Sequence, residues 1–312
     1  AFGGGKDSYV ALSIMQDAGY ACDTVSVILS NAVKEALQAS STDDLMFIKR
    51  RIDPRLIECN ARGDVYSGHI PVTAINSFLL LLLAAINGHD AVVFANERSA
   101  DEETVTINGV QANHQFSKTS IMERHIQNVL SEIKAPDYFS VLRSHSEYMI
   151  AQHFAGLNDD IHSHFLSCNK NFKSMRTDTR KRWCGECPKC AFTSLIISPF
   201  MTREKHIQIF GEDFLQKESL FPYFRELMGL SEQKPWECVG TIDECRIAVW
   251  DILRHNRLSK DDFLGALWSQ TGLDKGPEIQ NMRRHLLTPS ALYFYPERLK
   301  PYVTDPHNKS RA

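Results

Sequence analysis

The chain opens with a compact group of residues suited to binding a phosphate: Gly3, Gly4, Gly5, Lys6, Asp7 and Ser8. Glycines let the backbone approach an anion closely, and the first N–H groups of a following helix point at it. Lys6 can neutralise a phosphate oxygen, whereas Asp7 and Ser8 can cap the helix or hold Mg²⁺. The spacing differs from that of a Walker A loop. We predict a phosphate-binding loop of another kind; the alternative is a glycine turn with a helix cap.

Four of the eight cysteines have the spacing of metal ligands. Cys184, Cys187 and Cys190 form a C-x2-C-x2-C run, and Cys168 lies upstream in Ser-Cys-Asn. Four thiolates suit tetrahedral Zn²⁺, and a closed shell of four sulfurs is structural rather than catalytic. An iron–sulfur cluster and unlinked thiols are the alternatives. The other cysteines lack ligand spacing and are interpreted as buried apolar residues: Cys22, Cys59, Cys238 and Cys245.

The segment between Cys168 and Cys184 is rich in positive charge. Its basic residues are Lys170, Lys173, Arg176, Arg180, Lys181 and Arg182. Guanidinium groups bind phosphate oxygens through paired N–H donors. We interpret Arg180 and Arg182 as candidates for gripping a substrate diphosphate; the alternative is a solvated charged loop.

Three polar segments are expected to meet near the glycine loop. They are residues 67–73, residues 96–99 after a buried strand, and residues 113–120 before a helix. In an open α/β sheet the ligand lies beyond the carboxyl ends of the strands. The candidate reacting residues on these segments are His69, Glu97, Arg98, His114 and Lys118. The alternatives are a surface pair for Glu97 and Arg98 and ordinary loop histidines for the other two.

The hydrophobic pattern predicts strands alternating with helices up to about residue 170. Helices are expected at residues 6–18, 31–38, 72–86, 119–133 and 144–155, the third of them buried. Strands are expected at residues 24–29, 55–59, 91–95 and 139–142. This alternation is typical of an α/β domain with a parallel sheet. Such a sheet needs a strand before Gly3, so we expect the numbering to begin inside a longer protein.

The part of the chain after Cys190 is predicted to be mainly helical. Helices are expected at residues 191–197, 203–210, 241–254 and 259–270. Residues 273–312 show no clear periodicity, which suggests a loosely packed tail or a partner-binding edge. We therefore expect a nucleotide-binding α/β domain at 1–167, a zinc knuckle at 168–190 and a helical region at 191–312.

Composition excludes several classes of protein. The chain of 312 residues is 43% hydrophobic and 23% charged, which rules out disordered and fibrous proteins. A formal charge of -3 argues against a protein that coats nucleic acid or an anionic membrane. The longest apolar run, residues 78–86, is half the length of a membrane span, and from the opening residues we expect no signal peptide. Cysteines with metal-ligand spacing favour a reducing cytosol.

The glycine loop resembles that of the PP-loop ATP pyrophosphatases, although Gly3 stands where that family usually has Ser. The resemblance implies a HUP-like parallel sheet, with residues 3–8 at the pyrophosphate end of ATP. Together with the four cysteines, the chain is similar to 7-cyano-7-deazaguanine synthase, which activates a carboxylate with ATP and carries a zinc site. The gap between the first two cysteines is longer here.

Further segments resemble the UDP-N-acetyl-α-D-muramoyl-L-alanyl-L-glutamate epimerase family. They are GHIPVTA at 68–74, NERSA at 96–100, NHQFSK at 113–118, SCN at 167–169, WCGECPKC at 183–190 and ECVG at 237–240. The likeness covers most of residues 1–250 and weakens beyond them. It implies a cytoplasmic bacterial enzyme of peptidoglycan synthesis, hence of cell wall and cell shape. A further domain of that family would lie before Ala1.

The resemblance also implies a reaction. ATP and Mg²⁺ adenylate the terminal carboxylate of UDP-N-acetylmuramoyl-L-alanyl-L-glutamate, and a base then inverts the L-glutamate to D-glutamate. The residues assigned to the reacting end are Glu97, Arg98, His114, Lys118 and His69, with His114 as the first choice of base. A muramoyl-alanine L-glutamate ligase is a possible functional partner, and no nucleic acid or membrane is expected. Whether one base or two act is left open.

Two other functions are compatible with the sequence. The first is a PP-loop enzyme that forms an amide or nitrile, like the deazaguanine synthase, and consumes ammonia. The second is a zinc-stabilised nucleotide-binding module in an interaction or defence complex, without turnover. Release of AMP with and without the muramoyl dipeptide separates the three.

Overall fold

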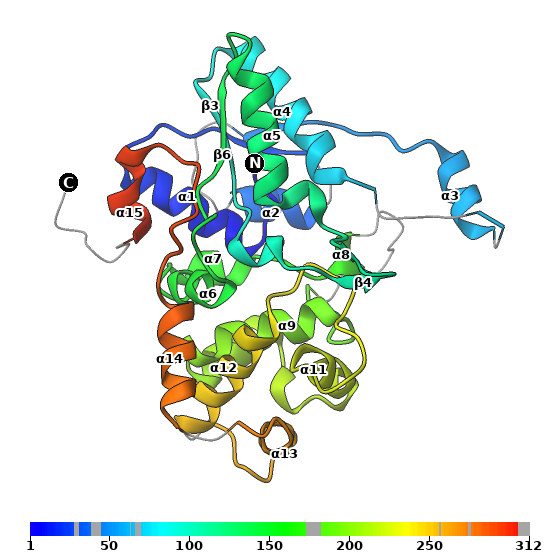
Figure 1. Cartoon of the computed structure of the whole chain (residues 1–312), viewed down its shortest axis with the longest axis vertical. Coiled ribbons are helices and arrows are strands. Elements are labelled where there is room, and N and C mark those ends of the chain that lie inside the picture. The colour runs from blue at the N-terminus through cyan, green and yellow to red at the C-terminus, as the bar shows by residue number, and fades with distance from the viewer. Residues whose placement is uncertain are drawn as a thin grey trace.

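The fold is known from a computed structural model, which describes residues 1–27, 31–38, 45–62, 64–65, 70–172, 182–255, 257–273 and 276–304. Strands and their covering helices form one end of the molecule, and a group of helices forms the other (Figure 1). A mixed α/β part followed by a helical region was expected from the sequence, and both are confirmed. In the part of the chain that the structure describes, no helix is long and apolar enough to cross a membrane.

Two pairs of parallel strands form the sheet, with the first residues of the chain between them. β1 (Thr24–Ser26) pairs with β2 (Leu45–Phe47), and β3 (Ala91–Phe94) pairs with β6 (Asp137–Ser140). The Phe2 N–H donates to the Val25 carbonyl at 2.8 Å, and the Ala1 amino group donates to the Val93 carbonyl at 2.8 Å. The segment that leads into the glycine loop therefore bonds to β1 on one side and to β3 on the other.

Helices cover this sheet, most of them at the positions that the hydrophobic periodicity of the sequence predicted. Their bounds are α1 (Lys6–Asp17), α2 (Asn31–Gln38), α4 (Val72–Asn87), α5 (Ser120–Ser131), α6 (Glu147–Ala155), α7 (Asp159–His164) and α8 (Asn169–Phe172). The α4 helix ends at Gly88, which has the left-handed φ of 72° expected of a C-terminal glycine. Its Leu80 and Leu81 are buried, but Phe78 and Leu82 are exposed, so the expectation of a fully buried helix is wrong. Only one stripe of a helix can face a sheet.

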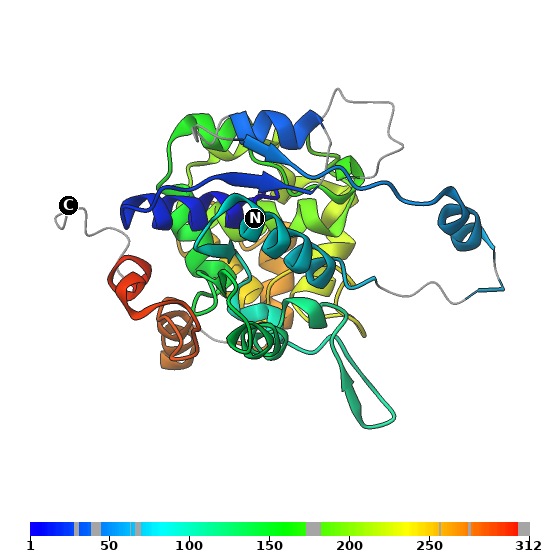
Figure 2. The same ribbon diagram turned by 90° about the horizontal axis from the view of Figure 1, so that it is seen from above.

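Three local predictions differ from the structure. Residues 55–59, expected as a strand, belong to α3 (Pro54–Ala61), because the Asp53 carboxylate caps its first turn and Pro54 suits that turn. β2 was not predicted. Nor was the antiparallel hairpin of β4 (Val105–Ile107) and β5 (Val110–Ala112), whose Asn108 and Gly109 both have positive φ. Both α3 and this hairpin project from the body of the molecule (Figure 2).

The helical region is built around two neighbouring helices, α9 (Pro188–Ile197) and α12 (Ile242–Arg254). The other helices are α10 (Arg203–Phe210), α11 (Phe221–Leu227), α13 (Phe263–Gln270), α14 (Pro277–Leu286) and α15 (Lys300–Thr304). Short 3-10 turns are η1 (Arg98–Asp101), η2 (Phe116–Lys118), η3 (Ser198–Phe200), η4 (Phe214–Gln216), η5 (Glu218–Leu220) and η6 (Glu297–Leu299). One hydrophobic core runs from α1 through α6 into α9 and α12.

The segment after residue 273 is not a loosely packed tail as far as residue 304. Ile279, Tyr295, Leu299 and Val303 are buried in the same core as α1 and α12. The Ser290 N–H donates to the Ser144 carbonyl at 2.8 Å. Apolar residues spaced along short helices and turns gave no periodic pattern, which is why the sequence did not reveal this packing.

Candidate functional site

The glycine loop connects the segment at Ala1 and Phe2 to α1. Gly4 adopts a left-handed φ of 78°, which favours glycine, and a Cβ there would make a tight contact of 3.3 Å with the Cβ of Ala36. The Gly3 N–H donates to the Ser8 hydroxyl oxygen at 3.0 Å, which closes the loop over the first helical turn. The amino end of α1 therefore opens at this loop, where the first N–H groups of a helix have no carbonyl partner within the helix.

Lys6 is held by two carboxylates. It is buried, and its ammonium group pairs with Asp7 and with Glu147, which begins α6. Burial disfavours the charged form, but the Asp7 and Glu147 carboxylates outweigh it and raise the pKa of Lys6. Burial raises the pKa of Glu147 to about 8, with Lys6 acting against that shift. Lys6, the predicted phosphate-binding lysine, therefore already pairs with two carboxylates, and a bound phosphate would be a third anionic partner.

Arg143 positions two of the loops predicted to carry the site. Its guanidinium is fully buried and donates to the Glu123 carboxylate at 2.7 and 3.0 Å. It also donates to the Glu97 carbonyl at 2.9 Å and to the Lys118 carbonyl at 2.7 Å. Because these carbonyls belong to loops after β3 and before α5, one side chain ties both loops together.

Glu97 and Lys118 lie in one electrostatic environment with Asp7. Burial disfavours charge on Lys118, but Cys238, Glu97 and Asp7 raise its pKa. The Lys118 Nζ lies 3.2 Å from the Cys238 Sγ. Glu97 as a whole residue is only 7% exposed, and no hydrogen bond or ion pair joins its carboxylate to a residue that the structure describes. Its oxygens are not among the fully buried polar atoms without a partner, so the carboxylate is open to solvent or to a ligand.

The other predicted residues have contacts of their own or lie outside the described residues. The Arg98 guanidinium is 3.4 Å from the Thr288 carbonyl. Burial lowers the pKa of Arg98, with Glu244 opposing that shift. His114 lies at the base of the β4–β5 hairpin, with Nδ1 2.6 Å from the Thr104 hydroxyl and its ring beside Trp236. His69 and Arg180 lie outside the described residues.

Arg182, proposed as a diphosphate ligand, contacts protein groups. It donates to the His164 carbonyl at 2.6 Å and to the Glu35 carboxylate at 3.1 Å. Lys170, from the same basic loop, pairs with Glu186 at 2.8 Å. Residues 173–181 of that loop lie outside the described residues.

Four residues near the charged group were not recognised from the sequence. They are Glu147, Lys189, Cys238 and Glu244. Lys189 follows Pro188 at the start of α9 and donates to the Cys238 carbonyl. Glu244 accepts from the Glu147 N–H at 2.8 Å. The interpretation of Cys238 as a buried apolar residue is wrong, because its thiol is half-buried beside an ammonium group.

The residues that make these contacts are far apart in the sequence. Lys189 stands within the cysteine run, and Cys238 within the ECVG segment. Only the packing of α9 against α12 brings them to one place. No local periodicity encodes that contact.

The four cysteines with ligand spacing meet. The sulfurs of Cys168, Cys184, Cys187 and Cys190 all lie within 4.8 Å of one another. Gly185 makes the left-handed turn between the first two cysteines of the run, and Cys187 caps α9. Four soft ligands at this separation fit a single Zn²⁺. In the described residues, this is the one group of three or more such side chains close enough to hold a metal.

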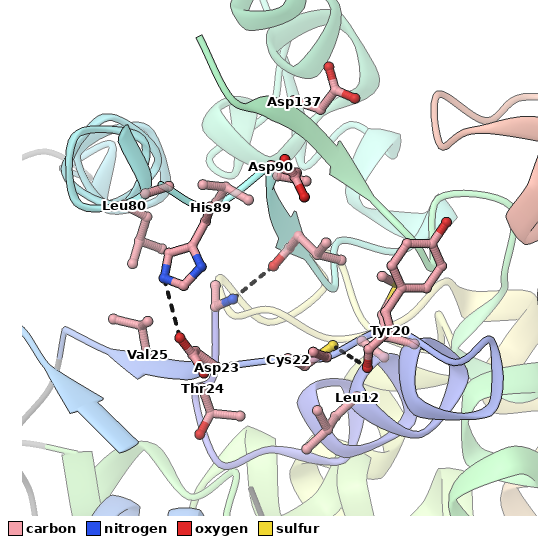
Figure 3. Close-up of a pocket in the computed structure, with 18 of the residues that line it drawn as sticks. Leu12, Tyr20, Cys22, Asp23, Thr24, Val25, Leu80, His89, Asp90 and Asp137 are labelled. Atoms are coloured by element: carbon pink, nitrogen blue, oxygen red, sulfur yellow. Dashed lines mark hydrogen bonds and ion pairs between the residues drawn. The ribbon is translucent and has the colours of Figure 1, made fainter. Parts of the chain in front are cut away.

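A cavity of about 380 Å³ lies elsewhere, between β1 and β3 (Figure 3). Its walls include Leu12, Val25 and Leu80, and the His89 Nε2 lies 3.3 Å from the Asp23 carboxylate at its rim. Asp23, Asp90 and Asp137 stand at the start of strands, whereas Glu97 follows the end of β3. The cavity is therefore at the amino end of the sheet, away from the charged group.

Comparison with known proteins gives two family matches. The model of the MurL N-terminal domain matches residues 1–141, and that of the MurL C-terminal domain matches residues 164–279. A UDP-N-acetyl-alpha-D-muramoyl-L-alanyl-L-glutamate epimerase from Micromonospora sp. is 42% identical over 254 residues, 80% of this chain and 55% of that protein. The epimerase of the same name from Xanthomonas oryzae pv. oryzae is 39% identical over 251 residues, again 80% and 55%. The chain spans about half the length of these relatives. No solved structure matches.

Proposed function

Since the chain belongs to the MurL family, we propose that it carries the catalytic part of an enzyme that inverts the terminal L-glutamate of UDP-N-acetylmuramoyl-L-alanyl-L-glutamate. The observation that carries this proposal is the charged group of Lys6, Asp7, Glu97 and Lys118 beside the glycine loop. It puts cations suited to phosphate next to carboxylates suited to Mg²⁺. The product would be a peptidoglycan precursor, made in the cytoplasm.

Activation by ATP explains why an epimerase needs a phosphate loop. The α-proton beside a carboxylate is poorly acidic, because its removal would place two negative charges side by side. In adenylation the carboxylate would attack the α-phosphorus of ATP and displace pyrophosphate, which gives a mixed carboxylic–phosphoric anhydride whose carbonyl accepts the electron pair. A positioned base then removes the proton, and reprotonation on the other face inverts the centre. Hydrolysis releases AMP and the D-isomer.

The nucleotide end would lie at residues 3–8, as the PP-loop resemblance implies. The loop N–H groups and the amino end of α1 would bind the pyrophosphate oxygens. Lys6 would exchange part of its pairing with Asp7 and Glu147 for a phosphate. Asp7 would hold Mg²⁺, which supplies charge neutralisation at the phosphates when bound.

The reacting end would lie at the loops tied by Arg143. Arg98 and Lys118 would orient the glutamate carboxylate, Glu97 would lie beside them at the reacting end, and His114 would act as the base, with His69 a further candidate. A neutral imidazole near pH 7 is well matched to proton removal. The loop that carries Arg180 and Arg182 would bind the UDP diphosphate, and the four cysteines would hold a structural zinc ion.

The full-length enzyme tests this function directly. Purified protein is incubated with ATP, Mg²⁺ and the muramoyl dipeptide, and AMP, pyrophosphate and D-glutamate after hydrolysis are measured. AMP formation should require the dipeptide and should accompany D-glutamate. AMP formed only when ammonia is added would instead identify an amide- or nitrile-forming enzyme. ATP binding with no AMP under any condition would identify a non-catalytic module.

A further inference from the structure

Lys189 connects the cysteine cluster to the charged group beside the glycine loop. It lies in the first turn of α9, between the cluster residues Cys187 and Cys190. Its ammonium group donates to the Cys238 carbonyl, on the segment that leads to α12. Because a cysteine of the cluster stands on each side of it, the backbone of Lys189 is held in place, and its side chain reaches toward the charged group.

Lys189 and Lys6 contact the same aromatic ring. Their Nζ atoms lie 5.7 and 5.9 Å from the centre of the Phe192 ring, which is within the range of a cation–π contact. Residues three positions apart on a helix lie on the same face, which places Lys189 over Phe192. The ring is buried, and a Cβ on Gly240 would lie only 3.0 Å from it. This tightly packed ring therefore keeps both ammonium groups near the glycine loop.

Lys189 also lies close to Lys118, through Cys238. The Cys238 carbonyl accepts from Lys189, and the Sγ of the same residue lies 3.2 Å from the Lys118 Nζ. In this series of contacts, Lys189 stands between two other lysines. Lys6 lies on one side, at the proposed nucleotide end, and Lys118 lies on the other, at the proposed reacting end.

The charge of Lys189 is not matched by a carboxylate in direct contact. Lys189 makes no ion pair with a residue that the structure describes, whereas Lys6 pairs with Asp7 and Glu147. Burial raises the pKa of Glu147, and Lys6 and Lys189 both oppose that shift, so both positive charges act on one buried carboxylate. An anion that binds beside Lys6 would therefore gain a further cation from Lys189.

We propose that Lys189 is a catalytic residue that binds the α-phosphate of ATP and neutralises its charge during adenylation. The inference rests on the proposed function. In that function the pyrophosphate end of ATP lies at residues 3–8, and the glutamate carboxylate lies at Lys118. The α-phosphorus is the atom that is bonded first to one and then to the other, so it must lie between them, where the contacts place Lys189.

The step balances without a further reactant. An oxygen of the glutamate carboxylate forms a bond to the α-phosphorus, the bond from that phosphorus to the pyrophosphate oxygen breaks, and its electron pair leaves with pyrophosphate. The oxygens of the α-phosphate are negatively charged and repel the incoming carboxylate. An ammonium group already in place reduces that repulsion, and Lys189 keeps its proton throughout.

Acetylation of lysines tests the contact in the unsubstituted full-length protein. An amine-acetylating reagent is applied with AMP, with pyrophosphate or with neither, and Lys189 and Lys217 are followed by peptide mass spectrometry. Lys217 is the matched control, because it is also half-buried, lies 5.7 Å from the centre of the Phe214 ring and contacts the cysteine run at Gly185.

AMP at a concentration well above its Kd should slow the acetylation of Lys189 at least about fivefold, and pyrophosphate should not. Neither ligand should change the rate at Lys217. Equal rates at Lys189 with and without AMP would overturn the proposal. Protection of Lys189 by pyrophosphate alone would also overturn it, because the lysine would then lie at the other end of the triphosphate.

Substitution in the full-length enzyme tests the catalytic role. Lys189→Gln keeps an N–H donor but removes the charge. Its affinity for AMP should fall about tenfold in calorimetric titration, with its affinity for pyrophosphate unchanged. With saturating ATP, Mg²⁺ and the dipeptide, AMP formation should fall at least about 100-fold. Lys217→Gln should match the unsubstituted enzyme in all three measurements.

The zinc content of Lys189→Gln separates loss of charge from loss of structure. Elemental analysis should find it unchanged; if zinc is lost, the acetylation result decides alone. Normal AMP formation by the zinc-loaded variant would overturn this inference and leave the proposed function standing. No AMP from the unsubstituted enzyme with the dipeptide would overturn both.

Discussion

The Leu166 N–H donates to the Gly4 carbonyl at 2.8 Å, which bonds the segment carrying Cys168 to the glycine loop. One residue further, a Cβ on Gly5 would lie 3.0 Å from the Ser167 hydroxyl. Cys168, the first residue of the cysteine cluster, follows directly after Ser167. A change in the positions of the four cysteines would therefore be transmitted to the phosphate loop through this short stretch of backbone.

Loss of one cysteine ligand should affect metal, stability and nucleotide binding together. Closed zinc sites contribute folding free energy directly, so Cys187→Ser should lower zinc content and reduce the melting temperature by at least about 5 °C. Because Leu166 is bonded to Gly4, ATP affinity should also fall. Elemental analysis, thermal unfolding and calorimetric titration measure the three quantities. Cys245→Ser, at a buried thiol outside the cluster, should lower stability without loss of zinc. Full zinc loading of Cys187→Ser would show that this ligand set is wrong.

Asp7→Asn should nearly abolish AMP formation while leaving the fold intact. The carboxylate follows the glycine loop and pairs with Lys6, and an amide of the same shape cannot hold Mg²⁺ equally well. We expect pyrophosphate release in the full-length enzyme to fall at least about 100-fold. Asp17→Asn, at the exposed end of the same helix, is the matched control. Near-normal pyrophosphate release from Asp7→Asn would exclude the assigned role.

Local patterns predicted the elements on which the site stands. The bounds of α2 and α10 match those expected from periodicity, and residues 3–8 form a loop and a helix start as predicted. The cysteine spacing correctly predicted a cluster. These successes share a cause, because each signal lies within a few neighbouring residues.

The failures come from contacts that join distant segments. Lys6 meets Glu147, and Lys118 meets Cys238, across more than one hundred positions of sequence. Acidic residues are common in the first turn of a helix, so the neighbouring sequence did not show that Glu147 pairs with Lys6. The Asn108-Gly109 turn is different, because its sequence signal was present and was overlooked.

Arg143→Met should destabilise the fold more than most single substitutions. It would leave the Glu123 carboxylate buried without its partner, which costs about 3–5 kcal/mol of unfolding free energy. The loops of Glu97 and Lys118 would also lose their shared donor, so AMP formation should fall. Denaturant unfolding measures the first effect. Arg143→Met combined with Glu123→Leu should recover part of the stability but not the activity. A double variant as unstable as the sum of the single variants would contradict the pairing.

Stability should fall as pH drops from about 6.5 toward 4, in part through His206. Burial lowers the pKa of His206 to about 4, so the folded state binds its proton less readily than the unfolded state does. Between the two pKa values only the unfolded imidazole is protonated, which lowers the unfolding free energy by up to about 1.4 kcal/mol per pH unit. His206→Gln should flatten this dependence relative to the unsubstituted protein in the same buffers. An unchanged slope would show that His206 is not buried in its neutral form.

The last prediction concerns His114 as the base for inversion, and its test separates adenylation from proton transfer. The Thr104 hydroxyl lies 2.6 Å from the His114 Nδ1 and therefore fixes the ring orientation. His114→Asn should still release AMP, because adenylation needs no α-base. With the L-dipeptide in D₂O, however, the rates of inversion and of deuterium uptake should fall at least about 100-fold.

Thr104→Val should slow inversion about tenfold with AMP release unaffected, since the base would lose its alignment. His125→Asn, at an exposed histidine on α5, should behave like the unsubstituted enzyme. Continued uptake by His114→Asn would assign the base to Glu97 or His69, and uptake by the unsubstituted enzyme without ATP would refute the adenylate mechanism itself.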